Sequence, residues 1–150
     1  MRFIGDYPAK TDAKGRVFLP ATFRRILDAE GELGLVLRCD VFQHCLVLYP
    51  ESVWNEQLSS LKASLNPWNS KEQMMLRQFV ADAEPVELDG QGRLLISKRK
   101  LQYAEISGEV RFLAMDDRIE IWSKAALEDV MSRSESLGGD LEALLGNVER

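Results

Sequence analysis

The chain has 150 residues, of which 45% are hydrophobic and 29% charged, and its formal net charge is -5. This composition is typical of a globular protein, and no apolar run approaches the roughly 20 residues that a membrane-spanning helix needs. Asp6 and Pro8 interrupt the N-terminal segment before it reaches the length of a secretory signal, so we expect a cytoplasmic protein whose cysteines stay reduced.

The first half is predicted to begin with a short strand that ends in a Gly-containing turn at residues 12–16, and this turn leads into a short apolar strand at 17–19. A polar helix is expected near 21–27, before Gly31 and Gly34 break the chain. Residues 35–37 and 46–49 are apolar over the length of a strand, and we expect these two strands to pair.

Two helices are predicted next, one that closes the first half and one in the connector that follows it. Pro50 opens the first helix, which has one face formed by Val53, Trp54, Gln57, Leu58 and Leu61 at i, i+3, i+4 spacing. The second helix contains Met74, Met75, Gln78 and Phe79, and Ser70 is expected to cap it. The turn-forming residues 66–70 separate the two helices.

The second half follows the same order as the first. A strand at 94–96 precedes a short polar helix, and strands at 109–113 and 118–122 are expected to pair through a turn at Asp116 and Asp117. The tail from 132 to 150 is acidic, and its leucines could form one weak amphipathic turn; disorder and a partner contact both fit it.

The two halves form an internal repeat. Residues 12–20 (DAKGRVFLP) align with residues 89–97 (DGQGRLLIS) at an offset of 77, which matches the Asp, Gly and Arg of an Asp-x-x-x-Arg loop. Residues 45–58 align with residues 118–131 at an offset of 73. The chain therefore carries two similar halves, each with one such loop.

The segments DAKGRVFLPATFRR, CLVLYPESVW, LDGQGRLLIS and RIEIWS together resemble the MraZ family over about residues 1–131. The resemblance implies an α+β fold, mainly β, in which tandem swapped-hairpin AbrB-like halves form a pseudo-two-fold β-barrel with flanking helices. We expect the first half with its closing helix at 1–65, a helical connector at 66–84, the second half at 85–131 and an acidic tail at 132–150.

The resemblance also implies a function. It indicates a sequence-specific DNA-binding transcriptional regulator that represses the division and cell-wall gene cluster, including its own gene. Such a protein would form a ring-like homo-oligomer on double-stranded DNA with repeated promoter boxes, in the cytoplasm at the nucleoid. No cofactor and no enzymatic activity are expected, because the chain has one His and lacks a nucleophile elbow and a phosphate-binding glycine loop.

The distribution of charge is compatible with DNA binding even though the whole chain is acidic. Residues 1–25 carry six basic and two acidic side chains, and residues 89–100 carry four and one. Because a DNA-binding surface depends on local charge, these two basic segments are the candidate interface.

The loops themselves suit DNA. Gly15 and Gly92 allow a backbone with φ > 0, which presents Arg16 and Arg93 at the start of a strand. A guanidinium can bind a phosphate or the O6 and N7 edge of guanine with two hydrogen bonds. Phosphate would repel the aspartates, so we expect them to accept turn N–H groups or to orient the arginine of their own loop.

The predicted DNA contacts are Arg16, Lys14, Gly15, Asp12, Arg24, Arg93 and Arg25. Of the two helix arginines, Arg24 matches the family pattern. The first loop is the firmer prediction, because Gln91 replaces Lys14 in the second loop and the second half has Ser97 and Lys98 where the family has a proline.

Other interpretations of these residues remain open. Each loop could be only a turn closed by its own ion pair, and residues 98–100 could be a second phosphate patch or a solvated helix face. Trp54, Trp68 and Trp122 are expected to pack in the core or in a subunit interface.

His44 lies near Cys39 and Cys45 in the sequence, but the three fit no metal-binding spacing, so no metal is expected and the cysteines are expected to fill core space. The alternative function is a protein-interaction scaffold or neutralising partner that does not bind DNA.

Overall fold

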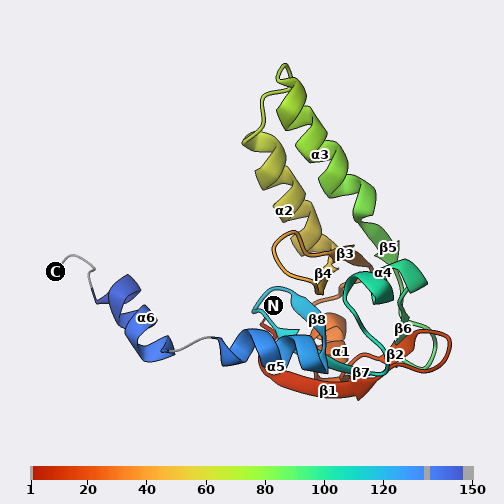
Figure 1. The fold of residues 1–150 in the computed structure, drawn as a ribbon. Helices are drawn as coiled ribbons and strands as arrows, with labels where there is room; N and C mark the ends of the chain where they lie inside the picture. The colour runs from red at the N-terminus through yellow and green to blue at the C-terminus, as the bar shows by residue number, and fades with distance from the viewer. Residues whose placement is uncertain (1, 134–135, 147–150) are drawn as a thin grey trace.

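A computed structural model describes residues 2–133 and 136–146 of the chain (Figure 1). Its elements in chain order are β1 (Asp6–Lys10), β2 (Arg16–Phe18), α1 (Ala21–Ala29), β3 (Leu35–Cys39), β4 (Leu46–Pro50), α2 (Glu51–Ala63), α3 (Ser70–Asp82), β5 (Glu84–Val86), β6 (Arg93–Leu95), α4 (Lys98–Tyr103), β7 (Glu109–Ala114), β8 (Ile119–Ser123), α5 (Lys124–Ser132) and α6 (Leu137–Leu145). The predicted α+β class is confirmed, but the expectation that the fold is mainly β is wrong: more of the described residues lie in helices than in strands, because α2, α3 and α6 add to two halves whose strands are short.

The strands form one six-stranded antiparallel sheet and one two-stranded sheet. The order in the large sheet is β1-β7-β8-β4-β3-β5, and β2 pairs with β6 in the small sheet. The halves exchange strands, because β1 pairs with β7 and β5 pairs with β3. The described strands do not close into one sheet, so the barrel stays a prediction.

The predicted hairpins are present in the large sheet. β3 pairs with β4 and β7 pairs with β8, and Asp116 adopts a φ of 66° in the turn between β7 and β8. The two edge strands, β1 and β5, contain Pro8 and Pro85. Proline cannot donate a backbone hydrogen bond, so these edges are poor templates for further strand pairing.

The main core lies on the face of the large sheet that is covered by the β2-β6 ribbon and α1. Alternate residues of β2 and β6 point into it, and Val17 and Leu94 are at most 1% exposed. Phe23 of α1 packs edge-to-face on Phe3 and Tyr7, with ring centroids 5.4 and 5.1 Å apart. The ribbon is thereby fixed to the core by its inner face.

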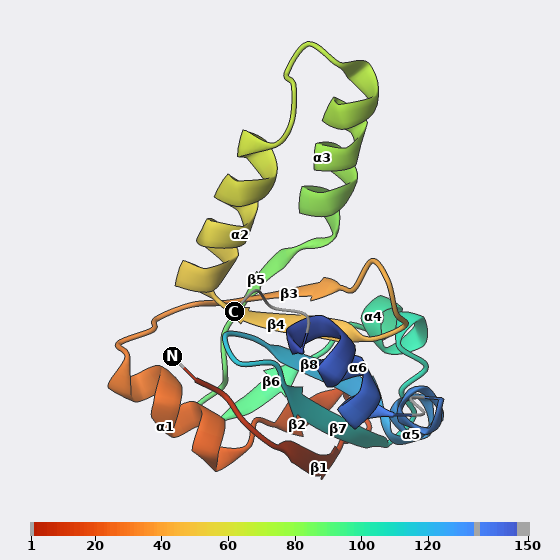
Figure 2. The ribbon, with the colours of Figure 1, turned by 90° about the vertical axis from the view of Figure 1, so that its left-hand side faces the viewer.

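Helices α2 and α3 form an arm that projects from the large sheet (Figures 1 and 2). The predicted apolar face of α2 is confirmed at its base, where Val53 and Trp54 are buried and Trp54 stacks on Phe79 at 5.3 Å. Asn69, rather than the predicted Ser70, caps α3, because the Asn69 side chain accepts a hydrogen bond from Glu72 N.

The three tryptophans, which were predicted to pack in the core or in a subunit interface, divide into two groups: two lie in the core, and for Trp68 only the interface alternative stays a prediction. Trp54 and Trp122 are buried, but Trp68 is 93% exposed. Trp68 lies in the turn that joins α2 to α3, at the tip of the arm, where no other element covers it (Figure 1). A two-helix arm has no second layer at its tip that could bury a large side chain.

The C-terminal region contains two helices. α5 covers part of the large sheet through Leu127, which packs near Trp122, whereas α6 lies apart from both sheets and buries no side chain (Figure 1). α6 is longer than the single turn predicted from its leucines. Within residues 2–133 and 136–146, no helix combines the length and apolar character needed to cross a membrane.

Candidate nucleic-acid interface

The first Asp-x-x-x-Arg loop is held together by one carboxylate. Asp12 Oδ1 accepts hydrogen bonds from the backbone N–H groups of Lys14 and Arg16, both at 2.9 Å. Asp12 Oδ2 accepts a hydrogen bond from Arg16 Nε at 2.7 Å. The predicted local role of Asp12 is therefore confirmed: the same side chain shapes the turn and orients the arginine.

The second loop has the same geometry. Asp89 Oδ1 accepts from the N–H groups of Gln91 and Arg93 at 2.9 Å each, and Oδ2 accepts from Arg93 Nε at 2.7 Å. The matching contacts show that the repeated residues Asp, Gly and Arg form the same turn in both halves.

Both aspartates are held in the charged form. The hydrogen bond from Arg16 N, with smaller contributions from the Arg16 side chain and Lys14 N, lowers the pKa of Asp12 below its usual value despite some desolvation. Arg93 N and then the Arg93 side chain do the same for the pKa of Asp89. A charged carboxylate on Nε leaves the outer edge of each guanidinium open: Nη1 and Nη2 of Arg16 and Arg93 have no hydrogen-bond partner in the described part of the chain.

The two glycines are required for different reasons. Gly15 and Gly92 have φ values of +83° and +84°, as predicted. A Cβ on Gly15 would lie 2.7 Å from the backbone oxygen of Ile96, whereas a Cβ on Gly92 would collide with the guanidinium of Arg24. The first loop is thus confined by backbone and the second by a side chain.

The loops lie at opposite ends of the β2-β6 ribbon. The strands are antiparallel, with Arg16 opposite Leu95 and Phe18 opposite Arg93. Because side chains alternate along a strand, these four residues share the outer face of the ribbon. Phe18 and Leu95 are 53% and 59% exposed, and the Arg93 guanidinium lies 5.8 Å from the Phe18 ring centroid.

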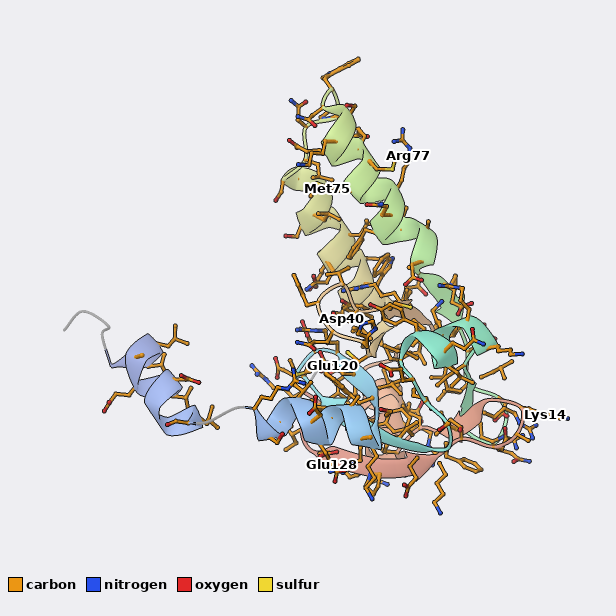
Figure 3. All side chains as sticks on the ribbon, in the orientation of Figure 1. Lys14, Asp40, Met75, Arg77, Glu120 and Glu128 are labelled. Atoms are coloured by element: carbon orange, nitrogen blue, oxygen red, sulfur yellow. The ribbon has the colours of Figure 1, made fainter. Side chains whose placement is uncertain are left out.

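The outer face of the ribbon therefore carries two arginines on one diagonal and two exposed apolar side chains on the other. Lys14 extends from the first loop at the periphery of the molecule, well away from the helical arm (Figure 3). Sequence reasoning missed Phe18 and Leu95, because the runs 17–19 and 94–96 were predicted only as apolar strands and their residues were not assigned to an inner and an outer face. The period of two could have identified them.

Arg24 and Arg25 make different contacts. Arg24 Nη1 donates to the carbonyl oxygen of Gln91 at 3.3 Å, so Arg24 contacts the second loop. Arg25 is exposed and donates to Thr22 Oγ1 at 3.4 Å. A DNA contact by either residue stays a prediction, but Arg24 already has a contact that supports the loop beside it.

Residues 98–100 do not form the second phosphate patch that was considered. Lys100 is 1% exposed, and its Nζ donates to Asp82 O at 3.1 Å and pairs with Glu84 at 3.0 Å. Arg99 pairs with the Asp82 carboxylate at 3.0 Å. Of the three residues 98–100, only Lys98 is an exposed cation without an ion pair to another described residue. Arg99 and Lys100 instead connect α4 to the end of α3 and to β5.

The other sequence candidates lie elsewhere. The His44 ring is 5.2 Å from the Tyr103 ring, and Cys39 and Cys45 are free thiols; Cys45 fills core space as expected, and burial raises its pKa. No group of three or more His, Cys, Asp or Glu side chains in the described ranges is arranged to hold a metal ion.

The chain is similar to one protein family over both halves. The family described as "MraZ protein, putative antitoxin-like" matches residues 3–78 and 79–147. Relatives named "Transcriptional regulator MraZ" include one from Phocaeicola vulgatus, 55% identical over 152 residues, which cover 99% of this chain and 99% of the relative. Those from Bacteroides thetaiotaomicron and Flavobacterium psychrophilum are 51% and 34% identical over 100% and 97% of this chain, and over 96% and 92% of their own length.

Proposed function

The chain belongs to the MraZ family of transcriptional regulators, and on that premise we propose that it binds double-stranded DNA in a sequence-specific manner through the outer face of its β2-β6 ribbon. The observation that carries the proposal is the duplicated loop, in which Asp12 and Asp89 orient Arg16 and Arg93 through Nε. Two oriented guanidinium groups on one rigid ribbon form a surface suited to a polyanion.

The dimensions of the ribbon suit the major groove, which admits a two-stranded β-ribbon. The free Nη atoms of Arg16 could then bind O6 and N7 of one guanine, and Lys14 could neutralise a neighbouring phosphate. Exposed Phe18 and Leu95 would contact apolar groups such as the thymine methyl group. Arg24 would act by holding the second loop, and Arg25 by contacting the DNA backbone.

The regulatory role that we propose is repression of the division and cell-wall gene cluster, including the gene of this protein, from a cytoplasmic, nucleoid-associated position. We also propose a ring-like homo-oligomer on repeated promoter boxes. Each loop offers few contacts, and joining several ribbons in one assembly would multiply their combined affinity without any new contact.

We further propose that the chain is a tandem of swapped-hairpin AbrB-like halves forming a pseudo-two-fold barrel, with limits at 1–65, 66–84, 85–131 and 132–150. The exchange of β1 and β5 between the halves supports this organisation, as does the pairing of β2 with β6 about a local two-fold axis.

Binding to a labelled promoter duplex with repeated boxes, measured by fluorescence anisotropy at two salt concentrations, tests the proposal. Arg16→Ala should weaken binding by roughly 10- to 100-fold, in line with about 1–3 kcal/mol for a bidentate contact to guanine. Arg133→Ala is the matched control, because Arg133 also pairs with an aspartate four residues earlier, Asp129 at 2.7 Å, but lies at the C-terminal end of α5 as its cap residue. Equal affinities for the two variants would remove Arg16 from the interface.

The alternative is a scaffold or neutralising partner that does not bind DNA. Exposed Trp68 and the exposed leucines of α6 favour some protein contact. A stable complex with another protein, together with no salt-dependent binding to the promoter duplex, would favour this alternative.

A further inference from the structure

Helix α6 presents an apolar face that no other described element covers. Its four leucines, Leu137, Leu141, Leu144 and Leu145, are between 44% and 72% exposed. Their spacing of four, three and one residues places them on one face of the helix. Asp140 and Glu142 flank this face, one on each side, so an acceptor for α6 should be apolar with a positive border.

The helix needs such an acceptor in order to be stable. α6 has nine residues, including Gly138 and Gly139, and buries none of its side chains. Isolated helices shorter than about 12 residues are marginal in water, and glycine disfavours the helical state further. The cap that Ser136 Oγ provides by accepting from Gly139 N satisfies only one end of the helix.

The tip of the α2-α3 arm presents an exposed tryptophan on a hydrogen-bonded turn. Trp68 is 93% exposed, and the backbone N–H of Trp68 donates to Asn66 Oδ1 at 2.9 Å. Asn66 N donates in turn to Glu72 Oε1 at 2.7 Å, and Asn69 caps α3. These hydrogen bonds fix the backbone of the turn that carries Trp68, and tryptophan is among the residues that dominate the binding energy of many interfaces.

The outer side of α3 continues this surface toward the body of the molecule. Met74 and Met75 are 48% and 46% exposed, and Lys71 lies one turn before Met75 (Figure 3 labels Met75). Between residues 62 and 77 the arm carries Lys62, Lys71 and Arg77, and Glu72 is its one acidic residue there. The distal arm thus provides the apolar surface and the positive border that an acceptor for α6 needs.

We propose that α6 of one copy docks its leucine face on Trp68 and the adjacent outer side of α3 of a second copy. Asp140 and Glu142 would lie near Lys71 and Lys62. The contact joins two different surfaces, so head-to-tail repetition closes a ring where the rotation between copies permits. This inference deepens the self-assembly included in the proposed function and rests on it, but it does not require that the loops bind DNA.

The mass of the full chain, measured by sedimentation velocity over a concentration series, tests the contact. Leu141→Glu with Leu144→Glu, and separately Trp68→Ser, should each weaken association at least 10-fold, and combining them should add little. Gly138→Ala should tighten association several-fold, because a Cβ there meets no atom within 4 Å and favours the helix. An unchanged association in either of the weakening variants, or a monomeric wild type, would overturn the proposal.

Cysteine pairing establishes which chains are joined. Equal amounts of Leu144→Cys and Met74→Cys protein should form a disulfide-linked heterodimer under mild oxidation that neither variant forms alone. A chain carrying both changes that instead forms the bond within one molecule at high dilution would overturn docking between copies. Arg16→Ala should retain the wild-type mass, so a failure of this contact is distinguishable from a failure of DNA binding.

Discussion

The two halves contain the same loop but surround it differently. α1 and α4 begin at the same point of the repeat, after Pro20 and Ser97. In the first helix Phe23 enters the main core and Arg24 reaches the second loop. At the equivalent positions of the second helix, Lys100 is buried against Asp82 and Glu84, and Leu101 lies next to Gly15 of the first loop.

The comparison shows that the shape of each loop depends on residues within the loop, whereas the residues that pack behind the loop come from a distant part of the chain. Asp12 and Asp89 make the same contacts at the same distances, because hydrogen bonds within five residues define the turn. Each loop is backed by the helix of the opposite half, so a polar residue supports the second loop and an apolar residue supports the first. The two loops can therefore be changed independently.

The largest effect should come from Lys100, whose buried polar contacts have no equivalent in the first half, where Phe23 occupies the same position of the repeat. Lys100→Ala should lower the free energy of unfolding by about 3 kcal/mol, since it removes a buried stem and leaves the Asp82 carbonyl without its donor. Lys100→Met, which keeps the stem, should cost about 1 kcal/mol. Urea unfolding at fixed protein concentration measures both changes, and a loss within about 0.5 kcal/mol, as expected for exposed Lys98→Ala, would contradict the structural role of Lys100.

Alanine substitutions at the two loop glycines should lower the free energy of unfolding by a smaller amount, which differs between the two loops. Gly15→Ala should cost about 2 kcal/mol, because the positive φ is strained and the added Cβ meets the backbone of Ile96. Gly92→Ala should cost about 1 kcal/mol, since the mobile end of Arg24 can move aside. Thermal unfolding of the two variants provides the comparison, and a larger loss for Gly92→Ala would show that the Arg24 contact is rigid.

The smallest effect should be on DNA affinity and should follow from changing the charge at equivalent positions of the two loops, Lys14 and Gln91. Gln91→Lys should strengthen binding to the promoter duplex a few-fold and steepen the salt dependence by about 0.9 per new phosphate contact, and Lys14→Gln should do the reverse. Combining the two changes should restore the wild-type salt slope if both loops face DNA. Anisotropy titrations at several salt concentrations measure the slope, and no response to Gln91→Lys would assign DNA contact to the first loop alone.

Much of the fold could be predicted because it depends on short segments. The hairpins of β3-β4 and β7-β8, the start of α2 after Pro50 and the positive φ of Gly15 follow from periodicity and turn chemistry. The cap of α3 was displaced by one residue to Asn69, since Asn and Ser are both good caps and only the turn geometry distinguishes them.

The candidate site was predicted less completely. Arg16 and Arg93 lie on a shared surface, but the exposure of Phe18 and Leu95 and the contact of Arg24 with Gln91 depend on which elements pack together. The same is true of Lys100, whose neighbours in the sequence are exposed cations while it is buried itself.

The sequence alone determined the duplicated loop and the oriented arginine within it, because the hydrogen bonds that Asp12 and Asp89 accept are made by residues at most four positions away. Only the tertiary structure decided that the halves exchange strands and that both arginines face outward on one ribbon. It also decided that Trp68 projects at the tip of an arm. These features depend on contacts between residues far apart in the chain, and burial of the shared core, rather than any local pattern, selects them.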